Sequence, residues 1–405
     1  MGPLGGVRVI DLSTVLMGPQ ATQALAEMGA DVVKVEAPDG DVIRQVGPAR
    51  HDGMGALFLN SNRGKRGLCL DLKHPRGRDA LLAVLRDADV LVHNLRPQAI
   101  ARLGLDYAAL APTHPRLVYA TLCGFGRGGP YSGRPAYDDL IQGASGLSYW
   151  IAKAGDGTPR YVPTALADRV VGMAAVGAIC AALFHRERGG RGQEIEIPMF
   201  ETMAALVLAD HLSGATFQPP LEGEGYARLL SRHRRPYRTR DGHVCALVYT
   251  DRHWAALLAE LGEADLPQRD PRFATFASRS ENIDHIYAFL GERFLERDTA
   301  QWLELLQRID VPAMPMHDVP GLLADPHLAA VGFFREFDHP AEGRLRGTAA
   351  TVRWSGSVPT PPSPAPRQGE HGVEVLRDAG LDDAAIRALV ADGVLVLPPA
   401  AGESG

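Results

Sequence analysis

The sequence predicts an α/β protein with a Rossmann-like, doubly wound and mainly parallel sheet, followed by a second, smaller α/β domain. Three features of the 405-residue chain predict this. Short apolar runs alternate with helix-like segments through the first third, a long and strongly apolar helix follows, and a segment rich in Gly, Pro and Arg then precedes a smaller block of mixed pattern. Alternation of strand and helix is typical of parallel sheets covered by helices on both faces.

The first strand–helix–strand unit lies at the N-terminus. Residues 7–12 (VRVIDL) form a short apolar strand, and the turn Met17-Gly-Pro-Gln20 opens a helix that runs to about Met28. Residues 31–36 (DVVKVE) form the second strand. The whole unit has roughly the minimum length of such a motif, about 30 residues.

The same alternation continues along the chain. Pro75 suits the first turn of a helix, where its missing N–H costs nothing. From Asp168 a strongly apolar helix runs to about Arg188 and ends at Gly189-Gly190, a common stop signal. The further elements that we expect are strands at 67–72, 89–93, 117–122, 193–197, 243–249 and 344–354, and helices at 75–87, 198–212, 251–262, 282–294 and 298–308.

These segments predict two domains. A large Rossmann-like domain comprises residues 1–213 and is completed by residues 330–405, residues 214–236 form a linker, and residues 237–329 form the small α/β domain. A chain of 405 residues exceeds the size at which a single hydrophobic core usually stops growing, so a division is expected on length as well.

The composition is that of an ordinary globular protein, with 45% hydrophobic and 22% charged residues. A formal net charge of −6 argues against a nucleic-acid-binding or membrane-surface protein. The longest apolar run, residues 170–184, is shorter than the ~20 residues that a membrane span needs, and the N-terminus lacks the features of a signal peptide. The four cysteines form no Cys-x-x-Cys pair, which argues against disulfides and zinc. We therefore expect a cytoplasmic protein with no metal, nucleic-acid or membrane partner.

A glycine cluster, Gly124-Phe-Gly-Arg-Gly-Gly129, directly follows the strand predicted at 117–122. Its spacing matches the G-x-G-x-x-G loop of dinucleotide-binding proteins, but that loop needs a helix to begin there. The chain continues Pro130-Tyr-Ser-Gly-Arg-Pro135, which cannot be that helix. We therefore expect a flexible loop at the carboxyl end of a strand, where open α/β sheets bind ligands.

A basic segment follows residue 62, with cationic side chains at Arg63, Lys65, Arg66 and Lys73. Lysine and arginine both bind phosphates well, so this segment could neutralise a phosphorylated ligand. A solvated charged loop explains the same pattern. The residues alone leave both interpretations open.

Asp168 stands immediately before the long apolar helix. Aspartate is among the preferred N-cap residues, so a purely structural role is one interpretation. A helix N-terminus also lowers the pKa of a carboxylate and keeps it ionised, as a nucleophilic carboxylate requires. The pair Asp138-Asp139 is better explained as the start of another helix than as a metal or acid–base pair, because neighbouring side chains point in different directions.

Taken together, the ordered segments resemble the family III CoA-transferases (the CaiB/BaiF family), the group of formyl-CoA transferase and carnitine CoA-transferase. The resemblance is dense over residues 5–212 and weaker beyond, where Asp241-Gly242 and Trp254 are the recognisable points. The matching segments are Val9–Leu12, Met17–Pro19, Met28–Glu36, Asn60–Arg66, Leu70–Lys73, Ala88–Pro97, Arg102–Gly104, Gly124–Gly126 with Gly129-Pro130, Pro135–Asp138, Ala167-Asp168 with Gly172, and Gly190–Gln193.

The resemblance implies that Asp168 is a nucleophile that forms covalent anhydride and thioester intermediates, with acyl-CoA as substrate and no metal. It also implies an intertwined homodimer. The many arginines around the presumed site favour a small carboxylic acid as the other substrate, dicarboxylic acids such as succinate included. The positions that would contact the acyl group are Tyr137 and Gly126, and those that would contact coenzyme A are Leu16, Met17, Leu70, Lys73, Asn94, Leu95 and Arg102.

The chain departs from formyl-CoA transferase at two places. An arginine that formyl-CoA transferase carries after the second strand is Ala37 here, so the contact with the nucleotide must differ. The glycine-rich lid loop of that enzyme has no clear counterpart in the second domain. The lack of that loop argues against formyl or oxalyl specificity.

Two other functions remain open from the sequence. An acyl-CoA racemase or epimerase shares this fold and uses a histidine–aspartate pair, but the histidine position is Tyr137 here. A tyrosine, with a pKa near ~10, is a poor base at neutral pH. A non-catalytic CoA-binding protein is the third function, favoured if Asp168 serves only as a helix cap.

Overall fold

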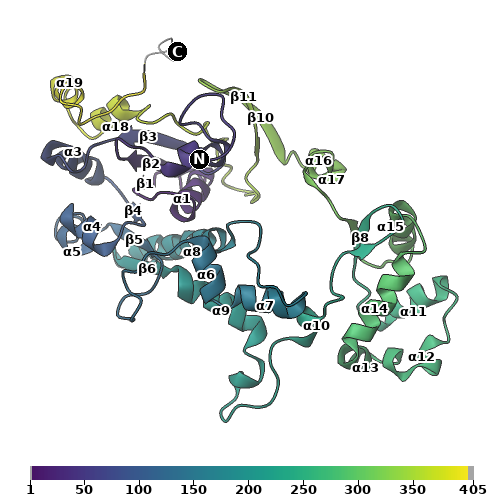
Figure 1. Cartoon of the computed structure of the whole chain (residues 1–405). Coiled ribbons are helices and arrows are strands. Elements are labelled where there is room, and N and C mark those ends of the chain that lie inside the picture. The colour runs from purple at the N-terminus through teal and green to yellow at the C-terminus, as the bar shows by residue number, and fades with distance from the viewer. Residues whose placement is uncertain (1, 400–405) are drawn as a thin grey trace. The chain divides into compact units, whose positions relative to one another are not determined.

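The computed structural model describes residues 2–399 of the chain (Figure 1). It divides into two compact units. Unit 1 contains the described residues up to Ser145, Val162–Ala205, and those from Ala330 onward, and unit 2 contains Gly146–Tyr161 and Leu206–Ala329. Residues 146–161 and the predicted linker at 214–236 thus belong to unit 2.

Unit 1 is built on a six-stranded sheet in which every neighbouring pair is parallel. The strand order β3-β2-β1-β4-β5-β6 is that of a doubly wound Rossmann-like sheet, which confirms the predicted fold class. The strands are β1 (Arg8–Asp11), β2 (Asp31–Glu36), β3 (Lys65–Cys69), β4 (Val90–His93), β5 (Val118–Cys123) and β6 (Glu194–Pro198).

The direction of winding reverses between β1 and β4. Ile10 of β1 pairs with Val33 of β2 on one side and with Leu91 of β4 on the other. The connections that leave the two central strands therefore diverge at their carboxyl ends. Such a topological switch point is where open α/β sheets bind ligands.

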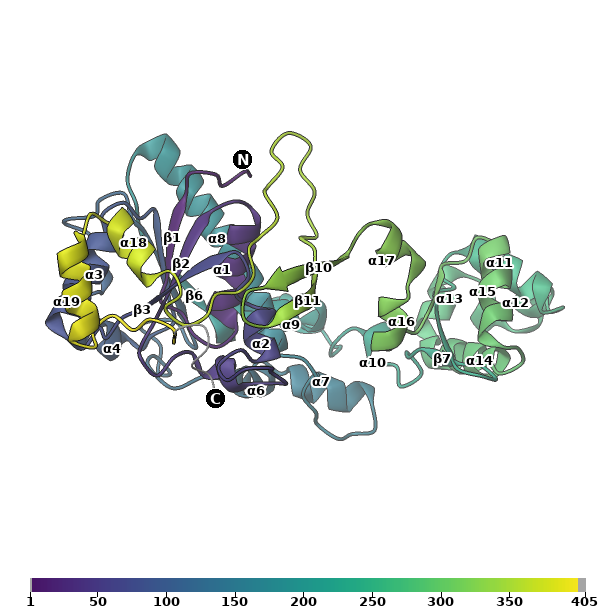
Figure 2. The same ribbon diagram turned by 90° about the horizontal axis from the view of Figure 1, so that it is seen from above.

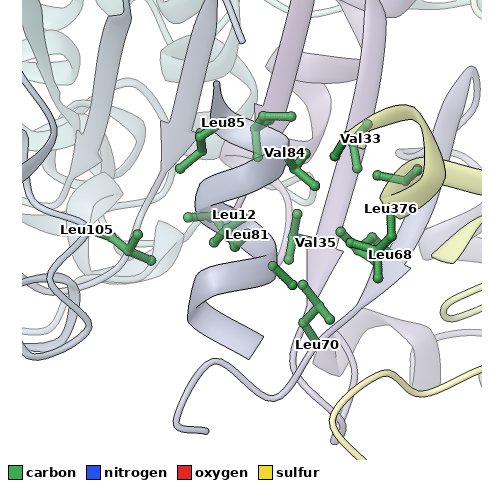
Figure 3. Close-up of a cluster of buried hydrophobic side chains, with 14 of the residues drawn as sticks. Leu12, Val33, Val35, Leu68, Leu70, Leu81, Val84, Leu85, Leu105 and Leu376 are labelled. Carbon is green, nitrogen blue, oxygen red and sulfur yellow. The ribbon is translucent and has the colours of Figure 1, made fainter. Parts of the chain in front are cut away.

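Helices cover both faces of this sheet (Figures 1 and 2). On one face α1 (Met17–Glu27) packs against α8 (Leu166–Gly189), and α8 in turn contacts β5 and β6. On the other face α3 (Pro75–Leu85) and α18 (Gly372–Asp378) share a core with the strands. Figure 3 shows Leu81 and Leu85 of α3 and Leu376 of α18 over side chains of β2 and β3.

The C-terminal part of unit 1 covers the sheet at β3. Leu395 forms an antiparallel bridge with Leu70, just beyond β3, and the Val396 N–H donates to the Cys69 carbonyl at 3.0 Å. The side chains of Val375, Leu376, Leu389 and Leu395 belong to the same buried cluster as the sheet. Residues far apart in sequence thus complete one core.

Helix α8 is long and apolar enough, by length and composition alone, to cross a membrane. Its packing against α1, β5 and β6 is equally that of a core helix in a globular unit. The buried side comprises Val171, Ala175, Ile179 and Leu183.

Unit 2 has a three-stranded antiparallel sheet, β7 (Tyr237–Arg238), β8 (His243–Ala246) and β9 (Ala313–Pro315), and confirms the predicted smaller α/β domain. Its core comprises aromatic and aliphatic side chains, among them Trp254 and Trp302. The principal helices are α11 (Asp251–Glu260), α14 (Ile283–Phe294) and α15 (Thr299–Arg308).

The remaining elements are shorter connections and edge structures. In unit 1 they are η1 (Val42–Gln45), α2 (Ala56–Leu59), α4 (Pro97–Arg102), α5 (Tyr107–Leu110), α6 (Asp138–Ala144), α19 (Asp383–Ala391) and the hairpin of β10 (Phe334–His339) with β11 (Gly343–Thr348). In unit 2 they are α7 (Leu147–Ala154), η2 (Ser213–Thr216), α10 (Ala227–Leu230), α12 (Leu266–Arg269), η3 (Pro271–Phe273), α13 (Phe276–Glu281), α16 (Val319–Leu323) and α17 (Pro326–Ala330). Helix α9 (Met199–His211) begins in unit 1 and ends in unit 2.

Candidate active site

A cavity of about 230 Å³ opens at the switch point of unit 1. Its walls come from the segments that follow β1, β4 and β5 and from the first turn of α8. Five of the residues predicted from the sequence line this one cavity: Met17, Asn94, Leu95, Tyr137 and Asp168. The fold thus brings together residues that are up to 151 positions apart in the chain (Met17 to Asp168).

Asp168 is the third residue of α8, not its N-cap. The helix begins at Leu166, after Ala165, and no side chain caps it. The prediction of a capping role is therefore wrong. The cause is a tight turn just before the helix, in which the Leu166 N–H donates to the Thr164 carbonyl at 2.7 Å and starts the helix two residues earlier.

The environment raises the pKa of Asp168 to about 6. Burial is the main cause and the nearby Asp138 carboxylate adds to it, whereas Arg169 opposes the shift. The expected lowering by the helix N-terminus is thus outweighed, and that prediction is wrong in direction. At neutral pH the group is still mostly ionised, and it is more basic than an ordinary aspartate. Both properties suit a carboxylate nucleophile.

Asp138, the first residue of α6, forms a hydrogen bond with the backbone of Asp168. Its Oδ1 accepts the Asp168 N–H at 3.0 Å, and its Oδ2 accepts the Gln142 side-chain amide at 2.5 Å. The fully buried Gln142 in turn accepts the Val162 N–H at 2.9 Å. The sequence predicted only a helix start at Asp138. Its contact with Asp168 joins residues 30 positions apart, and no local pattern signals it.

The two residues predicted to contact the acyl group differ in placement. Tyr137 precedes α6 directly, lines the cavity, and is 66% exposed. Gly126 does not line it, because its N–H is already bonded to Glu201 Oε1 at 2.9 Å. A Cβ at Gly126 would lie 2.7 Å from that same oxygen, which would have to move aside. The loop reaches the cavity through Gly124, Phe125 and Arg127 instead.

A second cavity, of about 430 Å³, adjoins the first and shares Thr14 and Leu95 with it. Lys73 lines it with an exposed side chain that forms no ion pair within residues 2–399. Ala37, the position where formyl-CoA transferase carries an arginine, lines it as well. Glu36, Asp39, Asp41 and Asp71 also line this second cavity, so among the described residues Lys73 is the one cation in its lining that could contact a phosphorylated end of a ligand.

The other predicted coenzyme A contacts lie outside both cavities. Leu16 is buried in a small cluster with Ile43 and Phe58, and Leu70 is fully buried in the main core. Arg102 is exposed at the end of α4. Any contact of Leu16 or Leu70 with a ligand must therefore use the backbone.

Both interpretations of the basic segment are wrong for Arg63, Lys65 and Arg66, which pair with carboxylates. Lys73 alone of the four is exposed and could bind a phosphate. Arg63 pairs with Glu27 at 3.3 Å, Lys65 with Asp11 at 2.9 Å and Arg66 with Asp31 at 2.6 Å. Lys65 begins β3, and its buried Nζ donates to Asp11, to the Pro19 carbonyl and to Asn62. Three of the four cations thus neutralise carboxylates of unit 1. In the described part of the chain no three His, Cys, Asp or Glu side chains are placed to hold a metal ion.

Comparison with known proteins identifies the family of this chain. The model of CoA-transferase family III matches residues 4–372. The chain is 34% identical to the succinyl-CoA:mesaconate CoA-transferase of Haloarcula marismortui, over 94% of this chain and 98% of the relative. It is 33% identical to the succinate–glutarate CoA-transferase of Agrobacterium fabrum, over 93% and 95%.

The fold agrees too. A crystal structure of a CaiB/BaiF family protein from Brucella suis superposes with a TM-score of 0.79 at 31% identity, over 93% of this chain and 99% of that one. The chain therefore belongs to CoA-transferase family III and is a CoA-transferase.

Proposed function

We propose that this enzyme moves coenzyme A between the thioester of a small dicarboxylic acid and a second carboxylic acid, and that Asp168 carries coenzyme A in between as an aspartyl thioester. The observation that supports this most is the placement of Asp168: a partly buried carboxylate with a raised pKa, in a cavity at the switch point of the sheet. The relatives from Haloarcula and Agrobacterium are named for succinate, mesaconate and glutarate, all dicarboxylic acids.

The transfer consists of four balanced exchanges. The Asp168 carboxylate attacks the donor thioester and releases the CoA thiolate, which leaves a mixed anhydride. The thiolate then attacks the aspartyl carbonyl, giving an aspartyl–CoA thioester and the free donor acid. The acceptor carboxylate attacks that thioester, forms a new mixed anhydride and releases the CoA thiolate, which then attacks the acyl carbonyl of the anhydride. The products are the new acyl-CoA and the original carboxylate of Asp168, and no step requires an energy source.

Two cationic side chains in the first cavity support an anionic substrate. Arg96 and Arg134 line it, and neither forms an ion pair with a carboxylate among residues 2–399. Arg127 lines it as well but is already neutralised by Glu194 and Glu196. Unpaired guanidinium groups recognise carboxylates well, so the cavity suits an acid with a second carboxylate.

A homodimer is part of the proposal. Met173 and Phe184 on the outer side of α8 are 61% and 64% exposed, and these large apolar side chains would be buried by a second chain. The intertwined arrangement comes from the resemblance of the sequence to the family. A mass in solution near twice 43.5 kDa is expected, and a monomer at working concentration would contradict it.

The decisive test of the function uses Asp168→Asn. Wild-type enzyme incubated with succinyl-CoA and hydroxylamine should gain a hydroxamate on Asp168, detected by peptide mass spectrometry. Transfer from succinyl-CoA to glutarate should fall by at least about 10⁴-fold in the variant, because the nucleophile is lost. Transfer that persists in Asp168→Asn, or a hydroxamate on another residue, would overturn the assignment.

A further inference from the structure

Val15, in the turn between β1 and α1, has a left-handed backbone with φ of +69°. Branched side chains rarely adopt this region, because the Cβ substituents crowd the backbone. The turn lines the cavity of Asp168 through Thr14, Val15 and Met17. A strained residue at this place needs a group that holds it.

A buried ion pair between Lys34 and Asp41 stabilises this conformation of Val15. The two carboxylate oxygens of Asp41 lie 3.1 and 3.3 Å from the Val15 nitrogen and accept its N–H. Lys34 Nζ donates to Asp41 Oδ2 at 2.9 Å and to the Ser13 carbonyl at 3.0 Å. The pair therefore binds the backbone on both sides of Thr14, at the Ser13 carbonyl and at the Val15 N–H.

Stability alone does not account for this pair. The side chains of Lys34 and Asp41 are both 0% exposed. Burying two charges removes their hydration, and well-packed apolar side chains are often at least as stable in the same place. The specific contribution of the pair is the acceptor for Val15 and the donor for Ser13, which apolar residues cannot supply.

The turn is also connected to the helix that carries Asp168. Asn94 holds Thr14 by bonds to its N–H and its carbonyl, at 3.0 and 2.9 Å. On the far side, a Cβ at Gly172 of α8 would lie only 2.8 Å from the Met17 carbonyl oxygen. The first turn of α1 thus lies tightly against the first turns of α8, one helical turn beyond Asp168.

We propose that Lys34 and Asp41 are positioning residues for the transfer reaction: they hold Val15 in its left-handed conformation and so set the turn at residues 14–17 against Asp168. Neither touches a reacting atom. This inference rests on the proposed function of Asp168. Lys34 lies in β2, and Asp41 lies in the segment after it and borders the second cavity.

The test is a double-mutant cycle between Asp41→Asn and Val15→Gly. With Val15 present, Asp41→Asn should lower kcat about 10- to 100-fold, because the single uncharged oxygen of the amide replaces two carboxylate oxygens that serve both Lys34 and the Val15 N–H, and the strained turn relaxes. In the Val15→Gly background the same change should cost less than about threefold, because glycine adopts positive φ freely. KM for the acceptor acid should change less than kcat. An equal loss of kcat in both backgrounds would overturn the proposal.

Asp89→Asn is the matched control. Asp89 also accepts a backbone N–H, that of Arg8 at 2.8 Å, and also pairs with a buried cation, Arg186 at 2.8 Å, but at the amino end of the sheet. Its removal should leave kcat within about twofold, with no dependence on Val15→Gly. If Asp89→Asn lowered kcat as much as Asp41→Asn does, the loss would reflect the removal of any buried ion pair and not the position of Val15. That result would overturn the proposal.

A second variant covers the case in which Asp41→Asn does not fold. Lys34→Met combined with Asp41→Leu removes both charges together, which avoids a stranded buried ion. It should fold and still lose kcat about 10-fold or more, since Val15 has no acceptor; full activity would overturn the proposal.

Hydrogen exchange separates this proposal from the function on which it rests. Peptides that cover residues 14–17 should exchange at least about tenfold faster in Asp41→Asn than in the wild type, whatever the enzyme transfers. If the wild type moves no CoA but this acceleration is seen, the proposed function is wrong, whereas the claim that Lys34 and Asp41 keep Val15 in its left-handed conformation is supported. Unchanged exchange would show that Asp41 does not stabilise the turn, and would overturn the proposal.

Discussion

Unit 1 buries two aspartates with opposite results. Asp11, at the end of β1, is fully buried, and although burial acts to raise its pKa, Lys65, Lys34 and two hydroxyl groups lower it to about 2. Asp168 is only partly buried, yet burial and Asp138 raise its pKa to about 6. The same penalty for losing water thus acts on both, and the neighbours decide the outcome. Cations and hydroxyl groups neutralise Asp11, whereas Arg169 offsets only part of the rise at Asp168, the carboxylate that we propose as the nucleophile.

The largest difference between the two aspartates should appear when Asp11 is changed. Asp11→Asn strands Lys65, whose Nζ lies 2.9 Å from Asp11 Oδ2, in the core. The free energy of unfolding in urea at pH 7 should fall by about 3–5 kcal/mol. Asp11→Leu combined with Lys65→Met should recover most of that loss. A single variant as stable as the wild type would show that the pair is not needed.

Asp168→Asn should do the opposite and stabilise the protein at neutral pH. A carboxyl whose pKa is raised on folding, here from 3.8 to about 6, stabilises the folded state only when protonated. That stability is present below pH ~4 and is lost as pH rises to ~6, so the ionised group costs about 1–3 kcal/mol above this range. Urea unfolding should show a gain of this size in the variant at pH 7 and almost none at pH 4. An unchanged or lower stability at pH 7 would contradict the comparison.

The smallest effect concerns the neighbour of Asp168. Asp138→Asn removes a negative charge but keeps an oxygen that can accept the Asp168 N–H. The pKa of Asp168 should fall, so the acid limb of kcat/KM against pH should move down by up to about one unit. Asp139→Asn is the control, since Asp139 is exposed on the same helix and does not line the cavity. Equal shifts in both variants would mean that the effect is only general electrostatics.

The sheet could be predicted from the sequence because each strand–helix pair has its own local pattern, as residues 7–36 show. Local pattern also located the apolar helix of Asp168. It could not place the start of that helix, which the turn at Thr164 decides, and so the capping role was wrong. The direction of the pKa shift followed from burial and from Asp138, and both depend on tertiary contacts.

The basic segment shows the same limit in another form. From the sequence, Arg63, Lys65 and Arg66 are cations near a turn, which is typical of a surface. Lys65 instead neutralises Asp11, a residue 54 positions earlier, inside the sheet. The placement of a charge depends on its partner, and partners far apart in sequence leave no local pattern. The resemblance to the family located Asp168, whereas only the structure located Asp138 and the Lys34–Asp41 pair.

The closure of β3 by residues 395–396 has a consequence for how the protein is made. Leu395 and Val396 bond to the end of a strand that ends at Cys69, so more than 300 residues are synthesised between them. While the chain is still on the ribosome, that end of the sheet offers bare backbone and apolar side chains to any other strand. Unit 2 has its own core from Leu206–Ala329 and can be complete earlier. Unit 1 therefore needs the end of the chain to complete its sheet, although its first strands are synthesised first.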